Sequence, residues 1–155
     1  MEKEGDIMVI EGGLSCELVD KVLNIFNNSH FSKFVGVEIV ALGNGLCRIT
    51  CPVKGDLLNS YNGVHGGVMA TLADVSMGLA VATHGRKTVT AELNVNYLAQ
   101  AVEGEVLVAE GRVVHQGDTL LVAECSISNS SDRLIAIARG MYVGKNPPLA
   151  DKNNL

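Results

Sequence analysis

Between His65 and His84 the sequence carries a single charged residue, Asp74, in a stretch made otherwise of small or apolar side chains and a few hydroxyl residues. Residues 65–83 predict one long helix, and Gly85 just beyond them is a typical helix stop. A helix that is apolar on almost every side is buried over most of its surface. The rest of the chain must therefore fold around this helix.

Helix and strand patterns flank this stretch on both sides. Ser15 is a good N-cap for a short amphipathic helix that ends near residue 27. Strand-like residues over 35–42 and 46–53 surround Gly43-Asn44-Gly45, which is a strong hairpin signal. Alternating patterns after the long helix predict four further strands, over residues 88–98, 106–114, 119–128 and 134–143.

These elements fit one domain, because 155 residues is about the length of a single domain. We expect a flexible acidic lead-in over residues 1–14, one α+β domain over 15–144 and a polar tail over 145–155. Consecutive strands joined by short turns favour an antiparallel meander. One sheet would cover only one side of the long helix, so we expect a second copy of the chain to cover the other side.

Composition argues against several classes of protein. The chain has 12 Lys+Arg and 17 Asp+Glu, a net charge of −5, whereas nucleic-acid binding needs a basic surface. The acidic N-terminus does not resemble a signal peptide, and residues 66–83 are too short and too small to span a bilayer. The four cysteines lack metal-ligand or redox spacing. We therefore expect a cytoplasmic protein that binds neither nucleic acid nor membrane and holds no metal.

Asp74 is the residue that this pattern explains least. Its neighbours one helical turn away are Ala70, Thr71, Met77 and Gly78. None of them can neutralise a carboxylate, and burying an unpaired carboxylate is costly. Either a distant group such as Arg139 or the polar face around Asn94 pairs with Asp74, or Asp74 is a general base or nucleophile in an apolar pocket.

The start of the long helix offers a complementary group. Its first backbone N–H groups have no acceptor within the helix, and Gly66 and Gly67 let a ligand approach them closely. Such N–H groups suit a carbonyl oxygen that develops negative charge, although the glycines could equally serve close packing. Asp74 lies eight residues beyond Gly66, about 12 Å along a helix axis. One chain cannot place both groups on one carbonyl, so we expect the site at a dimer interface.

The run Asn59-Ser60-Tyr61-Asn62-Gly63-Val64-His65-Gly66-Gly67, followed by Thr71-Leu72-Ala73-Asp74, resembles the signature of hotdog-fold acyl-CoA thioesterases of the phenylacetate-pathway (PaaI-like) type. The resemblance covers roughly residues 34–144. It implies a hotdog fold, in which a curved antiparallel sheet wraps around one long central helix. It also implies that two such domains pair edge to edge as a homodimer, often within a dimer of dimers.

The resemblance implies four catalytic residues. Asp74 would be the base or nucleophile in thioester hydrolysis, and the Gly66 N–H of the opposing subunit would polarise the thioester carbonyl. Asn59 would position the carbonyl or the attacking water, and His65 would orient the loop or assist the leaving thiolate. Taken alone, Asn59 could be a turn residue and His65 a structural cap.

Further positions are expected to bind the acyl-CoA substrate. They are Gly67, Thr90, Gln116, Gly117, Asp118, Thr119 and Lys145. Residues 115–120 resemble a segment that contacts CoA, but relatives often carry basic residues there and this chain has Asp118, which is unfavourable beside a phosphate. We therefore expect either that the phosphates rest on Lys145, on Arg112 or on Arg86-Lys87, or that phosphate recognition is weak.

The expected reaction is hydrolysis of an aryl- or fatty-acyl-CoA to a carboxylic acid and free CoA, with no metal or redox cofactor. One alternative is a hotdog hydratase or dehydratase, against which the spacing of Asn59 and Asp74 argues. The other is a non-catalytic acyl-CoA-binding or sensor protein, which need not retain the carboxylate.

Overall fold

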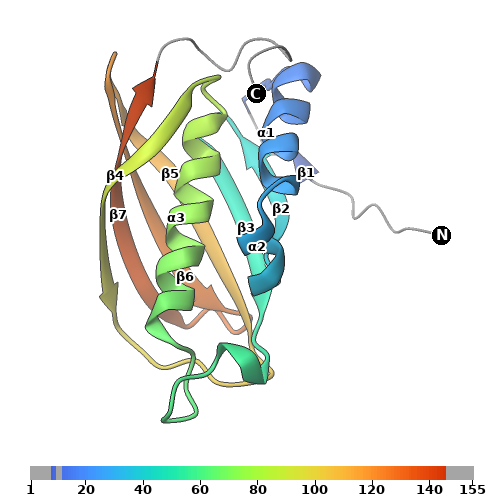
Figure 1. The fold of residues 1–155 in the computed structure, drawn as a ribbon, viewed down its shortest axis with the longest axis vertical. Helices are drawn as coiled ribbons and strands as arrows, with labels where there is room; N and C mark the ends of the chain where they lie inside the picture. Colours follow the sequence, from blue (N-terminus) through green and yellow to red (C-terminus); the bar gives the residue numbers. More distant parts are fainter. Residues whose placement is uncertain (1–7, 10–11, 146–155) are drawn as a thin grey trace, which may run out of the picture.

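The computed structural model describes residues 8–9 and 12–145. A curved sheet lies against one long helix, α3 (Figure 1), which confirms the α+β hotdog fold. In chain order the elements are β1 (Met8–Val9), α1 (Cys16–Asn27), α2 (His30–Val35), β2 (Glu38–Gly43), β3 (Leu46–Pro52), the 3₁₀ turn η1 (Gly55–Leu57), α3 (Gly66–Ala82), β4 (Lys87–Tyr97), β5 (Val106–Gln116), β6 (Leu120–Asn129) and β7 (Leu134–Lys145).

The sheet has the strand order β1-β2-β3-β5-β6-β7-β4. The strands from β2 to β7 pair antiparallel, and β1 pairs in parallel with β2. The predicted meander is correct for β5, β6 and β7 but wrong for β4, which pairs with β7 at the edge of the sheet. The reason is that α3 carries the chain across the sheet, so β4 forms at the far edge and β5 returns to pair with β3.

The N-terminal part differs from the expectation at two places. Residues 8–9 of the expected flexible lead-in form β1, whereas residues 1–7, 10–11 and the tail after 145 lie outside the described residues. The helix capped by Ser15 is confirmed as α1, but a second short helix, α2, stands where the strand pattern was expected to begin. Ser29 caps α2 and Gly36, with φ 84°, ends it.

Most of α3 is enclosed within this chain. The sheet lies along one side of the helix and α1 packs against another (Figure 1). Beyond the first turn of the helix, the less buried positions form one stripe, consisting of Ala70, Thr71, Asp74, Val75 and Gly78. The expectation that a sheet would leave a whole side of the helix bare is therefore wrong, because the curvature of the sheet and the added helix α1 leave only this stripe.

No helix in the described part of the chain is both long enough and apolar enough to cross a membrane. The same residues contain no group of three or more His, Cys, Asp or Glu side chains arranged to hold a metal ion. The four cysteines are free thiols, and three of them are buried. Burial raises the pKa of the Cys125 thiol to about 11.

The close approach of α3 to β5 depends on Gly111. A Cβ atom at this position would lie only 2.5 Å from the backbone nitrogen of Met77, and it would also overlap the backbone of Ser76. These neighbours are main-chain atoms of a buried helix, so no side-chain rotation can relieve the overlap. The position of α3 over the sheet is thus set by the absence of a side chain at residue 111.

We expect the substitution Gly111→Ala to lower the free energy of unfolding by about 3 kcal/mol or more, because α3 has to shift away from β5. Urea unfolding of the variant measures this loss. The control is Gly55→Ala, whose Cβ would meet only the mobile end of Glu103, at 3.3 Å. Equal stability of the two variants would contradict this account of helix packing.

Candidate active site

Asp74 lies in the less buried stripe of α3 and is half-buried. Its Oδ1 accepts hydrogen bonds from the Thr90 hydroxyl at 2.8 Å and the Tyr142 hydroxyl at 3.2 Å. Among the described residues no lysine or arginine forms an ion pair with it. The expectation of a fully buried, unpartnered carboxylate is therefore wrong in detail, since hydroxyl groups solvate one of its oxygens.

Of the two structural partners considered for Asp74, the polar face of the strand that holds Asn94 does contact it, through Thr90, whereas Arg139 does not. Arg139 lies 3.6 Å from Glu124 instead. Thr71, one helical turn away from Asp74, donates to the carbonyl oxygen of Gly67 at 2.8 Å. Two hydroxyl donors from the sheet hold the carboxylate, and they leave it uncompensated by any cation in the described structure.

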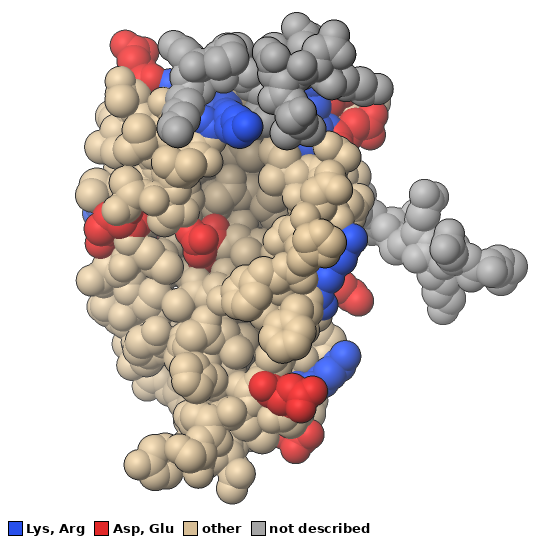
Figure 2. All heavy atoms as spheres, viewed as in Figure 1, with Lys and Arg blue, Asp and Glu red and all other residues tan. Residues whose placement is uncertain are grey.

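A groove of about 470 Å³ opens beside Asp74, between α1, α3 and β4. Figure 2 shows this hollow on the face of the molecule that exposes α3, with acidic atoms inside it. Its apolar walls come from Ile25, Phe26, Val75, Leu79 and Ala82. Arg86 and Lys87 line it as well, where the chain leaves α3 for β4. A carboxylate, an apolar wall and a cationic end thus share one groove.

Tyr142 is a site residue that the sequence reasoning missed. It lies on β7, is 2% exposed, and its hydroxyl reaches Asp74 across the interior. Burial, together with the adjacent Asp74 charge, raises the pKa of this phenol far above its usual value, so the hydroxyl keeps its proton and can donate. The available signal was a tyrosine that follows a run of small inward-facing residues on one strand.

Thr90, predicted as a substrate-binding hydroxyl, is on β4 and faces Asp74 directly. It lies opposite Tyr142 in the pairing of β4 with β7. The observed contact of Thr90 is to the carboxylate, and its binding of substrate stays a prediction.

The other predicted catalytic residues lie at or near the start of α3. His65 is the N-cap, and its Nδ1 accepts the Gly67 N–H at 2.9 Å. The Gly67 amide is therefore engaged in capping. The Gly66 N–H is the first of the helix and has no acceptor within it. The hydroxyl of Tyr97 donates to the Gly66 carbonyl at 3.2 Å, which anchors this turn to β4.

Asn59 shapes the loop that leads into α3. Its Oδ1 accepts the backbone N–H of Tyr61 at 2.8 Å and that of Gly63 at 3.2 Å. This turn places Asn62 in the left-handed region, with φ 61°. The carbonyl side of the Asn59 amide is thus used within the loop, and its NH₂ group is the part that remains to bind another molecule.

The structure therefore separates the four predicted catalytic residues into two groups. Asn59, His65 and Gly66 lie at the beginning of α3, whereas Asp74 lies two turns farther along the same unbroken helix. Eight residues of helix separate Gly66 from Asp74 by about 12 Å along the axis. Within one chain these groups do not meet at one atom.

The predicted CoA-contacting turn joins β5 to β6. Arg86 donates to the carbonyl oxygen of Gly117 at 2.6 Å and to that of Asp118. The Gly144 N–H donates to Thr119 at 2.9 Å. Gln116 is the last residue of β5. Because carbonyl oxygens carry no net charge, Arg86 keeps its positive charge while it holds the turn beside the groove.

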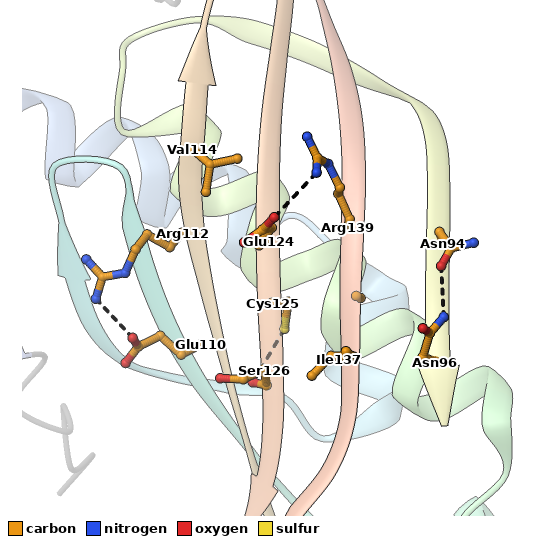
Figure 3. Close-up of a pocket in the computed structure, with 11 residues that line it drawn as sticks. Asn94, Asn96, Glu110, Arg112, Val114, Glu124, Cys125, Ser126, Ile137 and Arg139 are labelled. Atoms are coloured by element: carbon orange, nitrogen blue, oxygen red, sulfur yellow. Dashed lines mark hydrogen bonds and ion pairs between the residues drawn. The ribbon is translucent and has the colours of Figure 1, made fainter. Parts of the chain in front are cut away.

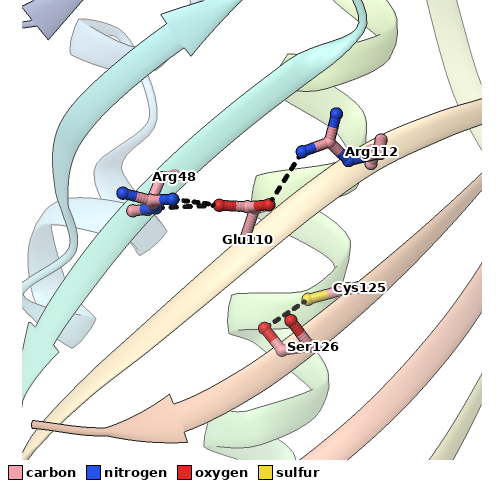
Figure 4. A network of polar contacts seen from close by, with 5 residues as sticks. All are labelled: Arg48, Glu110, Arg112, Cys125 and Ser126. Atoms are coloured by element: carbon pink, nitrogen blue, oxygen red, sulfur yellow. Dashed lines mark hydrogen bonds and ion pairs between the residues drawn. The ribbon is translucent and has the colours of Figure 1, made fainter. Parts of the chain in front are cut away.

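The three candidate phosphate sites differ in position. Lys87 and Lys145 are paired at the same end of β4 and β7. Arg112, by contrast, points to the outer face of the sheet, away from the groove, and lies 3.1 Å from Glu110 (Figure 4). Arg112 therefore does not share the groove with Arg86 and Lys87, because strand alternation turns its side chain to the face opposite α3.

A second hollow, of about 450 Å³, lies on this outer face (Figure 3). Its charged side chains are engaged with one another, Arg112 with Glu110 and Arg139 with Glu124. The Arg48–Glu110 pair on β3 and β5 extends the same row (Figure 4). These carboxylates are already paired with arginines, whereas Asp74 has no cationic partner among the described residues, so the groove beside Asp74 is the candidate site.

Comparison with known proteins identifies the family of this chain. Residues 61–136 match the family described as the thioesterase superfamily. A hypothetical thioesterase protein of Streptococcus pneumoniae, solved with coenzyme A, is 33% identical, with a TM-score of 0.70 over 72% of this chain and 90% of that one. The structure of Escherichia coli PaaI superposes with a TM-score of 0.84 and 25% identity over 88% of this chain and 99% of that one. The chain belongs to the PaaI-like thioesterases.

Named enzymes are among the relatives of this PaaI-like thioesterase. The acyl-coenzyme A thioesterase PaaI of Escherichia coli is 28% identical over 116 residues, which are 75% of this chain and 83% of PaaI. Human acyl-coenzyme A thioesterase 13 is 29% identical over 114 residues, 71% of this chain and 81% of that protein. The chain is a thioester hydrolase with acyl-CoA thioesterase activity.

The Streptococcus protein has also been solved as two variants, in which one aspartate and one threonine are each replaced by alanine. The two replaced positions are 16 apart in that protein. The same separation joins Asp74 and Thr90 in this thioesterase.

The cap formed by His65 in this thioesterase leads to a direct test. We expect His65→Ala to lower the free energy of unfolding by about 1 kcal/mol, whereas His65→Asn, whose side-chain oxygen can also cap, keeps it close to wild type. Turnover should fall in His65→Ala together with stability, because the cap holds Gly66 in place. In His65→Asn the turnover rate should stay within about threefold of wild type. A loss of turnover in His65→Asn as large as in His65→Ala would instead show that the imidazole takes part in the reaction.

Proposed function

We propose that this thioesterase hydrolyses aryl- or fatty-acyl-CoA at a site shared between two copies of the chain. The observation that carries the proposal is the Asp74 carboxylate, which faces an apolar groove and is held by hydroxyl groups, with no cation among its described partners. In the reaction water attacks the thioester carbonyl, the C–S bond breaks, and the products are a carboxylic acid and free CoA thiol.

In this proposal, Asp74 of one subunit promotes attack on the carbonyl carbon of the thioester. As a general base it takes a proton from the attacking water and later returns it to the CoA thiolate; as a nucleophile it forms an anhydride that water then opens. Thr90 holds Oδ1 in either route. The Streptococcus variants support this assignment, because an aspartate and a threonine with the same separation were chosen for replacement there.

The oxyanion that forms during attack needs hydrogen-bond donors about 3 Å away. The Gly66 N–H is suited to this, since it is the first of α3 and adds the positive end of the helix dipole. Because Gly66 and Asp74 of one chain are about 12 Å apart, the donor comes from the partner subunit. The NH₂ group of Asn59 and the loop that it closes lie on the same side as Gly66 and complete that half of the site.

The proposed dimer pairs β4 with its copy in the partner. In the described sheet β4 is an edge strand, bonded to β7 on one side only. Its side chains are largely exposed on both faces, including the apolar Val89, at 51%, and Tyr97, at 52%. Unpaired strand edges readily accept another strand. Such pairing extends the sheet across two domains, and the dimer of dimers that the resemblance implied builds on it.

The CoA moiety is assigned to the cationic end of the groove. Arg86 and Lys87 line the groove, and Lys145 is placed opposite Lys87 by strand pairing. Three cations outweigh the Asp118 carboxylate in attracting phosphate groups. The Streptococcus relative solved with coenzyme A supports a CoA substrate. The apolar walls of the groove suit the acyl group, and no metal or redox cofactor enters the proposed reaction.

We expect Asp74→Asn to lower kcat by roughly 10²–10⁴-fold while the protein stays folded, because a carboxamide neither accepts the proton nor attacks the carbonyl. Release of free thiol from a panel of aryl- and fatty-acyl-CoAs measures the rate, and circular dichroism verifies the fold. Equal rates in wild type and Asp74→Asn would refute the mechanism. Binding of acyl-CoA without turnover by the wild type would favour a sensor, and hydration of an enoyl-CoA would favour a hydratase.

Mixed dimers test whether the site is shared. Gly66→Pro removes the N–H at a helix position that tolerates proline, and His65, with φ −63° and ψ 135°, already has a backbone compatible with it. Neither Gly66→Pro nor Asp74→Ala should be active alone. Each mixed dimer contains one intact site, so random equal mixing restores about a quarter of wild-type activity.

The control for the proline substitution is Gly66→Ala, which keeps the N–H and whose Cβ would make an ordinary 3.4 Å contact with the Tyr97 ring. This variant should remain close to wild type. No recovery of activity on mixing, with dimer exchange verified by tagged subunits, would show that the two groups do not act on one substrate.

A further inference from the structure

On the inner face of β7, the side chains change from small to large at Tyr142. The inward-facing positions before it carry only small residues, Ala136, Ala138 and Gly140, and the large phenol then follows. The ring fits a slot between two glycines. A Cβ at Gly140 would lie 3.0 Å from the ring, and a Cβ at Gly78 of α3 would lie 3.7 Å from it. Two positions without side chains thus make room for this one phenol beneath Asp74.

The hydroxyl at the end of this ring has its partner on α3. It lies 3.2 Å from Asp74 Oδ1 and 3.3 Å from the Asp74 carbonyl oxygen. The phenol stays protonated, because burial and the neighbouring carboxylate raise its pKa. Tyr142 is therefore a fixed donor, and its proton points at the residue on which the proposed reaction depends.

Thr90 contributes a second donor to the same oxygen, at 2.8 Å. Thr90 and Tyr142 are direct cross-strand partners in the pairing of β4 with β7. The register shifts immediately after Thr90, before Glu92. Bulges of this kind re-aim side chains near active sites. One short and one long side chain from neighbouring strands thus converge on Oδ1, and Oδ2 has no donor among the described residues.

We propose that Tyr142 is a positioning residue for thioester hydrolysis. Together with Thr90 it holds Oδ1 so that the plane of the carboxylate is fixed and Oδ2 is presented to the groove. This inference rests on the proposed role of Asp74. A carboxylate held at one oxygen attacks, or takes a proton, from a defined direction, and small errors of placement at a reacting group are costly in rate. Substrate binding in the groove does not depend on this contact.

The test is Tyr142→Phe, which keeps the ring in its slot and removes only the hydroxyl. We expect kcat to fall about tenfold or more, as for the loss of a hydrogen bond to a charged group, while KM stays within about twofold of wild type. The matched control is Ile135→Val, which removes one buried methylene from the same strand without touching Asp74. It should leave both constants near wild type although it also lowers the melting temperature.

Combination with Thr90→Val tests the shared oxygen. If both hydroxyls act by holding Oδ1, the double variant loses less activity than the product of the two single losses. Losses that multiply independently would overturn the proposal. A kcat within about twofold of wild type in Tyr142→Phe would also overturn it, as would a fall no larger than that in Ile135→Val.

Asp74→Asn is assayed in parallel, so that two kinds of failure are distinguished. An inactive Asp74→Asn beside a normal Tyr142→Phe refutes the role of Tyr142 alone. An active Asp74→Asn refutes the proposed function, and the positioning role falls with it.

If Tyr142→Phe fails to fold, nuclear magnetic resonance of tyrosine-labelled protein decides the question. The chain has three tyrosines, of which Tyr142 alone is buried. Its hydroxyl proton should exchange slowly, and its signal should move in Asp74→Asn. A signal that is unchanged by Asp74→Asn would overturn the proposal.

Discussion

The close packing of α3 against β5 determines which positions of this helix can carry a charged side chain. Gly111 lets the two backbones approach so closely that the curved sheet and α1 enclose most of the helix surface. One stripe of mostly small side chains stays at the rim, and Asp74 lies in it. A carboxylate on any other face would be buried without a partner, at a cost of several kcal/mol. Packing thus confines a charged side chain of α3 to this stripe.

Carboxylates have different partners on the two faces of the sheet. On the outer face carboxylates are paired with arginines, as in Arg48–Glu110 and Arg139–Glu124. On the inner face the one carboxylate of α3 meets two hydroxyls instead. An arginine there would form a charge-assisted pair and occupy the carboxylate. Hydroxyl donors orient it and leave its negative charge available, which is the property that a base or nucleophile needs.

Local sequence patterns predicted much of this arrangement and missed what depends on distant pairing. The extent of α3 and the hairpin at Asn44-Gly45 follow from nearby residues, and both are confirmed. The pairing of β4 with β7 cannot be predicted from the sequence of either strand. Both strands alternate apolar and polar residues in the same way, and this alternation does not specify a partner. The role of Tyr142 depends on its register with Thr90, far away in the sequence, so only the folded structure could reveal it. The outward direction of Arg112 could not be read from the sequence for a similar reason, since the face to which a strand residue points depends on the register of the strand.

The proposed division of the site between two chains links catalysis to assembly. One unbroken helix carries the amide donors at its start and the carboxylate two turns later, so under this proposal each chain supplies half of two sites. Thr90, which orients the carboxylate, lies on β4, and β4 is also the edge strand that the proposed pairing uses. In the proposed dimer, the strand that carries the hydroxyl donor to Asp74 is therefore also the strand that brings the partner's amides to the site. In this scheme the dimer is part of the chemistry, because a single chain cannot bring a base and an oxyanion donor to one carbonyl.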